Sequence, residues 1–265
     1  MNAIAGSGSE LWRTDGTQAG TTAVAEVPFG SSLIAGASTD GWYGLLVGLG
    51  WGDSEVRLLR SDGTPQGTYL LKSISTLYQI PSTAMVAFGG HVFFLTHDLE
   101  SNTVLWASDG TPEGTRAVMV TAPPTFLDTP LPELAVTPLG LFFVAYDAAH
   151  GTELWTLEDP LGAPRRVADI LPGLGSSNPN GLHVAPSGLY FAANDGLHGE
   201  EPWLLPFTGG APCVASAKSL CLENGRFRVE AFWRKFDGVA GDAVATPLSA
   251  DTGYFWFFDD ANVEL

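Results

Sequence analysis

The chain has 265 residues, of which 45% are hydrophobic, and this is enough for a folded protein with a substantial core. Its 29 acidic residues outnumber 12 basic ones, and the formal net charge of −17 disfavours binding to the phosphate backbone of nucleic acids. The sequence contains no run of about 18 apolar residues, which a membrane span would require. The N-terminus shows neither the basic nor the apolar region of a signal peptide.

One short sequence recurs along the chain. Residues 10–17, 57–64 and 104–111 are close copies that end in Asp-Gly-Thr, whereas residues 153–155 and 201–203 keep only the first half. The same place in each copy holds a Trp or, once, a Leu. These marker residues stand 47, 47, 49 and 48 residues apart: Trp12, Leu59, Trp106, Trp155 and Trp203. A period this regular predicts stacked supersecondary units.

Each period predicts four short β-strands, and we find no helical periodicity of useful length. In the clearest unit, apolar or alternating runs at 134–136, 141–146, 152–156 and 165–170 are separated by turn residues. Matching second strands are predicted at 42–47, 91–95 and 189–193, and matching fourth strands at 22–27, 68–74 and 116–120.

A repeated four-stranded antiparallel unit of 40 to 50 residues is typical of a β-propeller blade. We therefore predict an all-β, propeller-like array of about four to five blades, complete or incomplete, over residues 1–210. A β-solenoid would need a shorter period, and a string of sandwiches would need a longer one. Residues 211–265 follow a Gly/Pro linker and are predicted to form a small, truncated β-rich C-terminal domain.

The chain begins in the middle of a repeat, so two arrangements of the blades are open. The first is an open arc with uncovered blade faces. The second is a small ring, closed when residues 10–15 and 22–27 pair with the last blade at 181–206.

Asp15, Asp62 and Asp109 open the Asp-Gly-Thr segments between third and fourth strands. An Asp side chain accepts hydrogen bonds from nearby backbone N–H groups, and Gly tolerates positive φ, so we interpret these residues as turn formers. The alternative is a cation site on one rim. Calcium needs six to eight oxygen ligands at one place, and one Asp per blade does not supply them. We predict no metal site and no cofactor.

The marker Trp residues are most simply interpreted as packing wedges between neighbouring blades, where each would bury a large apolar surface. Stacking on sugars is the alternative, and it requires exposed rings. Trp51 lies in a connecting loop and is the better, though weak, candidate for an exposed binding aromatic.

A search for catalytic patterns yields no candidate residue. The histidines lack the spacing of a zinc-binding HExxH motif, although His150 and His198 occupy the same place in two successive hairpins. No nucleophile elbow or phosphate loop is present. Cys213 and Cys221 fit either one short-loop disulfide or two reduced thiols.

These copies, over residues 9–206, resemble the bacterial ELWxxDGT repeat family, also described as hyalin-like. Leu59 in place of Trp, and the loss of Asp-Gly-Thr from the last two copies, depart from the family pattern. Residues 213–265 look like the start of a β-rich domain that accompanies such repeats. The resemblance implies a secreted or cell-surface β-propeller without established catalytic residues, which binds an unspecified protein or carbohydrate.

A weaker resemblance supplies an enzymatic alternative. Residues 145–155, and in part 194–203, are similar to the tryptophan-docking motif of quinoprotein propellers, in which an Asp-containing hairpin precedes a docked Trp. That family implies a dehydrogenase with a quinone, a Ca²⁺ ion and an eight-bladed ring. In it the Trp locks neighbouring blades, so the match favours propeller packing more than quinone chemistry.

Overall fold

The computed structural model describes residues 9–27, 32–39, 41–48, 55–76, 85–121, 133–207, 219–223 and 228–232. All secondary structure in these ranges consists of β-strands, joined by turns and paired antiparallel into five sheets, which we name A to E in chain order. The described residues contain no helix of the length and apolar character that crossing a membrane requires.

Sheets A to C come from the three copies that carry Asp-Gly-Thr. Within the described residues, sheet A holds two strands, β1 (Ser9–Arg13) and β2 (Thr22–Val27). Sheet B holds four strands in chain order: β3 (Ser32–Thr39), β4 (Trp42–Gly48), β5 (Glu55–Ser61) and β6 (Tyr69–Ser75). Sheet C repeats this order with β7 (Met85–Phe88), β8 (His91–His97), β9 (Thr103–Ser108) and β10 (Arg116–Thr121).

Sheets D and E come from the two copies without Asp-Gly-Thr. Sheet D holds β11 (Leu134–Thr137), β12 (Gly140–Asp147), β13 (Gly151–Leu157) and β14 (Arg165–Arg166). Sheet E has the order β15-β16-β17-β19-β18, with β15 (Asn180–Ala185), β16 (Gly188–Asn194), β17 (Glu200–Pro206), β18 (Ser219–Glu223) and β19 (Arg228–Phe232).

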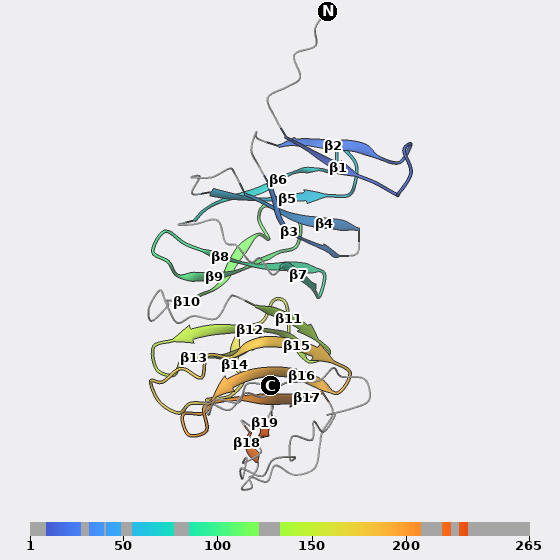
Figure 1. The fold of residues 1–265 in the computed structure, drawn as a ribbon. Helices are drawn as coiled ribbons and strands as arrows, with labels where there is room; N and C mark the ends of the chain where they lie inside the picture. The colour runs from blue at the N-terminus through green and yellow to red at the C-terminus, as the bar shows by residue number, and fades with distance from the viewer. Residues whose placement is uncertain are drawn as a thin grey trace, which may run out of the picture.

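The sheets follow one another in chain order, with sheet A at one end and sheet E at the other (Figure 1). The first strands of successive sheets, β3, β7, β11 and β15, lie next to one another, as inner strands of propeller blades do. The predicted fold class is therefore confirmed: the protein is an all-β, propeller-like array of four-stranded antiparallel sheets.

The closed ring, one of the two arrangements that the sequence leaves open, is not formed by the described strands. Among the strands that the structure describes, β1 and β2 pair only with each other, and the outer edge of β17 in the last sheet is occupied by β19. Since sheets A and E lie at opposite ends of the array, no ladder joins them (Figure 1). Of the two arrangements that the sequence left open, the open array is the observed one.

Three apolar cores fill the seams between sheets B and C, C and D, and D and E. Because side chains alternate along a strand, each central strand supplies one core from each of its faces. On β8, for example, Val92 and Phe94 face sheet B, whereas Phe93 and Leu95 face sheet D. A third core joins sheets D and E around Phe142, Leu154 and Trp203.

Two strands differ from the sequence prediction. Of the predicted strand at 165–170, only Arg165–Arg166 is a strand; the Val167 N–H still donates to the Leu154 carbonyl at 2.8 Å, and the Val167 and Ile170 side chains lie in the core between sheets D and E. In addition, β19 from the predicted C-terminal domain pairs with β17 and extends the last repeat sheet. The side chain of Val229 on β19 is buried in the core between sheets D and E.

Candidate functional site

The three Asp-Gly-Thr turns have the same hydrogen bonds. In the first, Asp15 Oδ1 accepts bonds from the backbone N–H of Thr17 at 2.9 Å and from its hydroxyl at 2.7 Å. Asp62 and Asp109 accept the same two bonds from Thr64 and Thr111 at the same distances. The Thr17 hydroxyl and N–H lower the pKa of Asp15, since they favour its charged form. Each carboxylate therefore serves its own turn, as the turn-forming interpretation requires.

Each turn contains two positions at which only glycine fits, one because of its backbone conformation and one because of the space beside it. The Gly after the Asp has positive φ, for example +84° at Gly63 and +87° at Gly110. The second Gly lies against the carboxylate, and a Cβ on Gly114 would fall 2.1 Å from Asp109 Oδ1. Gly20 and Gly67 have the same close approach to their own Asp residues. The carboxylate is thus packed onto the backbone of its own loop.

The turns of sheets B and C also contact the preceding sheet. Arg60 of sheet B donates a hydrogen bond from Nη1 to the carbonyl oxygen of Gly110 in sheet C at 3.1 Å. A Cβ on Gly110 would lie 2.9 Å from the Trp42 ring of sheet B. One sheet earlier, Gly63 lies near the guanidinium of Arg13. The repeat sequence therefore holds neighbouring sheets together as well as shaping the loop.

The marker residues point toward the preceding sheet. Trp203 is 1% exposed in the core between sheets D and E, and its indole N–H donates to the Ala193 carbonyl at 3.1 Å. Trp155 packs, partly buried, on the core between sheets C and D, and Trp106 on the core between B and C. Lys72 of sheet B lies 5.4 Å from the Trp106 ring centroid, across that seam. These three Trp side chains therefore pack between neighbouring sheets, as the wedge prediction requires.

A phenylalanine supports each of these indoles from the second strand of the same sheet. The strand registers place Trp106 opposite Phe94 and Trp203 opposite Phe191. Both pairs are stacked, with ring centroids 6.2 and 6.4 Å apart. Such cross-strand aromatic pairs stabilise a sheet beyond the area that they bury.

Trp12 differs from the predicted wedge, because its side chain is 55% exposed. Its place in β1 corresponds to the other markers, so its ring points away from sheet B. No described sheet lies on that side of sheet A (Figure 1). The indole N–H donates to Glu10 Oε2 at 3.1 Å instead of entering a core. The wedge interpretation of Trp12 is therefore wrong in the described structure.

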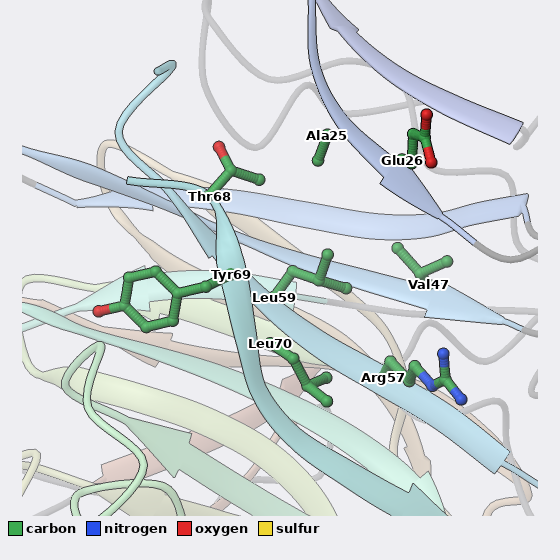
Figure 2. Close-up of a pocket in the computed structure, with 8 residues that line it drawn as sticks. All are labelled: Ala25, Glu26, Val47, Arg57, Leu59, Thr68, Tyr69 and Leu70. Atoms are coloured by element: carbon green, nitrogen blue, oxygen red, sulfur yellow. The ribbon is translucent and has the colours of Figure 1, made fainter. Parts of the chain in front are cut away.

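Leu59 occupies the marker position of sheet B, where it is 8% exposed at the seam with sheet A. The residue opposite it in the register is Leu45, so both aromatic positions of the other sheets hold leucine here. A cavity of about 160 Å³ remains at this seam, and Figure 2 shows that Ala25 and Glu26 come from β2 on one side and Leu59 from β5 on the other. It is lined by residues of sheets A and B: Ala25, Glu26, Val47, Arg57, Leu59, Thr68, Tyr69 and Leu70.

Two other sequence predictions fall on residues outside the described ranges. Trp51, the weak candidate for an exposed binding aromatic, lies outside the described residues. So does Cys213, and the pairing of Cys213 with Cys221 therefore stays open.

The hairpins before the last two markers share a pattern that the sequence analysis did not single out, Asp-x-x-His-x-x-Glu. In sheet D, Asp147 accepts a hydrogen bond from the His150 ring at 2.9 Å, and Arg166 approaches the same carboxylate at 3.5 Å. Glu153 is fully buried, yet its carboxylate is satisfied by Ser177 and by the N–H groups of Ile170 and Leu171. Burial raises the pKa of Glu153 to about 7 against these bonds.

The hairpin of sheet E has the same residues with different surroundings. Asp195 accepts the backbone N–H groups of Leu197 and His198 through Oδ1, and its Oδ2 lies 2.8 Å from Nδ1 of His198. Glu201 is 5% exposed, and neither of its carboxylate oxygens has a hydrogen-bond partner among the described residues. Burial, together with the nearby charge of Asp195, raises the pKa of Glu201 to about 7.

Asp195, His198 and Glu201 each offer one metal-binding atom, and these atoms lie within 4.8 Å of one another. The sequence analysis missed this group because it compared histidine spacings with helical zinc motifs. The informative signal was the recurrence of Asp and Glu at fixed distances from His in two successive hairpins. The sequence itself does not reveal that one of the two Glu side chains lacks a partner.

Comparisons with known proteins give low similarities. No protein-family model and no curated protein matches the chain. Among solved structures, TolB from Acinetobacter baumannii is similar over 84% of this chain and 59% of its own, with 10% identity and a TM-score of 0.42. Sqt1 from Saccharomyces cerevisiae is similar over 66% of this chain and 46% of its own, with 13% identity and a TM-score of 0.36.

A xylan β-1,4-xylosidase from Bacillus halodurans C-125 is similar over 70% of this chain and 43% of its own, with 12% identity and a TM-score of 0.33. The chain thus spans less than two thirds of the length of each of these three proteins. The fold assignment rests on the observed sheets and on the contacts between their first strands.

Proposed function

We propose that the chain is a non-catalytic β-propeller repeat module of the ELWxxDGT type, which binds a protein or a carbohydrate outside the cell or at its surface. The observation that carries the proposal is that the recurring residues have architectural roles. Asp15, Asp62 and Asp109 close turns, and Trp106 and Trp203 fill seams. A chain whose repeated Asp-Gly-Thr carboxylates are used within their own loops is suited to presenting a surface.

The exposed face of sheet A is the surface that we propose for binding. Trp12 is 55% exposed there, and Glu10 holds the indole N–H at 3.1 Å. A Trp ring held in one orientation supplies a large apolar contact at low entropic cost, and Trp is enriched in the residues that dominate binding energy. The ring is suited to stack on a sugar or to enter a pocket of a protein partner.

A glycan array probed with the labelled chain, alongside Trp12→Ala, tests this role. Tyr43→Ala is the matched control, because Tyr43 on β4 is 52% exposed on another sheet. We expect binding to at least one glycan class to fall at least tenfold in Trp12→Ala and to persist in Tyr43→Ala. Binding that Trp12→Ala leaves unchanged would remove Trp12 from the site.

No feature of the described residues favours the quinoprotein alternative over the binding module. Trp155, the docked residue of that resemblance, packs at the seam between sheets C and D. Incubation with a pyrroloquinoline quinone and Ca²⁺, followed by desalting, separates the two functions. A retained quinone absorbance would contradict the non-catalytic proposal.

A further inference from the structure

We propose that Asp195, His198 and Glu201 at the β16–β17 hairpin bind a divalent transition-metal ion of the Zn²⁺ class. The three residues offer two carboxylates and one imidazole, and their ligand atoms lie within 4.8 Å of one another. Zinc takes such nitrogen and oxygen ligands at about 2.0–2.2 Å, which places them about 3.3 Å apart in a tetrahedron. Small side-chain rotations therefore bring the three atoms to binding distance.

Glu201 provides the independent evidence for a missing ligand. Its side chain is 5% exposed, and both carboxylate oxygens are without a hydrogen-bond partner among the described residues. A buried carboxylate without a partner is costly, and buried charges in proteins are normally paired or coordinate metals. The unpartnered carboxylate belongs to the same group of ligand atoms as Asp195 and His198.

In the preceding hairpin, of sheet D, protein groups alone pair with the carboxylates of the same sequence pattern. Glu153 corresponds to Glu201, and the hydroxyl of Ser177 donates to it at 2.6 Å, with three backbone N–H groups completing the shell. Asp147 corresponds to Asp195, and the Arg166 guanidinium approaches it at 3.5 Å. Among the described residues, no hydroxyl or N–H group donates to the Glu201 carboxylate, and no guanidinium is paired with Asp195. A bound cation would provide the missing positive charge.

The composition of the group favours a transition metal over calcium. Calcium takes six to eight oxygen ligands, whereas an imidazole nitrogen beside carboxylates suits zinc and its neighbours. His198 is exposed and Asp195 and Glu201 are buried, so the site opens to solvent on the histidine side. The remaining coordination positions would be filled by water or by a donor atom from a binding partner.

Binding of Zn²⁺ to the chelator-treated chain, measured by calorimetry and by metal analysis after dialysis, tests the proposal. We expect one equivalent of Zn²⁺ at micromolar affinity or tighter, and a characteristic visible absorbance when Co²⁺ is added instead. Glu201→Gln and His198→Ala should each weaken binding at least tenfold. His198 is exposed, so its variant is expected to fold, and circular dichroism checks both variants.

His150→Ala and Glu153→Gln are the matched controls, since they alter the same pattern in the hairpin whose Glu already has partners. We expect both to bind Zn²⁺ like the unmodified chain. Absence of binding at millimolar Zn²⁺, preference for Ca²⁺ over Zn²⁺, or equal losses in the His150 and His198 variants would each overturn the proposal. These results concern metal binding alone and are independent of the glycan experiment on Trp12.

Discussion

Replacing Trp203 by Ala should destabilise the protein far more than replacing Trp12 by Ala. The two residues occupy the same repeat position, but Trp203 is 1% exposed and Trp12 is 55% exposed. Trp203 packs in the core between sheets D and E and stacks on Phe191. Its indole N–H also donates to the Ala193 carbonyl.

The magnitude follows from burial. Truncation of a buried Trp to Ala costs about 3–5 kcal/mol, because transfer free energy is lost and a cavity remains. For a chain of this length, that corresponds to a decrease in melting temperature of roughly 10 °C. Trp12→Ala removes a ring that is mostly in solvent already, so we expect at most about 1 kcal/mol.

Urea unfolding followed by far-ultraviolet circular dichroism measures both variants without using tryptophan fluorescence. A free energy of unfolding reduced by similar amounts in Trp203→Ala and Trp12→Ala would refute the reasoning. It would mean that the repeat position has the same surroundings in sheets A and E.

Three further predictions concern stability. Leu59→Trp should raise the free energy of unfolding by about 1 kcal/mol, because the cavity of about 160 Å³ beside Leu59 has room for an indole; a decrease in urea unfolding would contradict this. Gly114→Ala should lower the free energy of unfolding by about 2 kcal/mol, because the new Cβ would meet the Asp109 carboxylate. In a double-mutant cycle, Asp109→Ala should remove most of this cost, and additive effects of the two changes would argue against the contact. Burial raises the pKa of Glu153 to about 7, so the native state keeps a proton that the unfolded chain releases near its usual value of 4.5. The Glu153 contribution to stability is therefore complete below about pH 4.5 and is lost as the pH rises to about 7. Relative to Glu153→Gln, the unmodified chain should lose roughly 2–3 kcal/mol between about pH 5 and about pH 8, and identical pH profiles would exclude this role.

The fold was predictable because the period and the strand pattern agree. Phe142 and Phe143 lie in an unbroken apolar run, and such a run predicts a strand covered on both faces. In the structure the two side chains enter different seams, one toward sheet E and one toward sheet C. The turns were equally readable, because the bonds that Asp15 and Asp109 make are local in sequence.

The residues that the sequence could not place depend on neighbours far along the chain. Trp12 and Trp203 have the same local pattern, but sheet D covers the Trp203 ring, whereas no described sheet covers the Trp12 ring. The same holds for Glu153 and Glu201. One carboxylate is reached by Ser177, 24 residues further on, and the other has no described partner.

The short fourth strand of sheet D has a similar cause. Alternation at 165–170 predicts a strand, but the buried carboxylate of Glu153 draws the N–H groups of Ile170 and Leu171 away from a ladder. A local pattern cannot show this competition, because the acceptor lies on another strand.

Hydroxyl-radical footprinting of the intact chain tests most directly whether the marker indoles lie at seams between stacked sheets. Oxidation of each Trp is read from its peptide by mass spectrometry. The structure predicts fast oxidation of Trp12, slower oxidation of the half-buried Trp106 and Trp155, and protection of Trp203. Oxidation of Trp203 as fast as that of Trp12 would contradict the stacked arrangement.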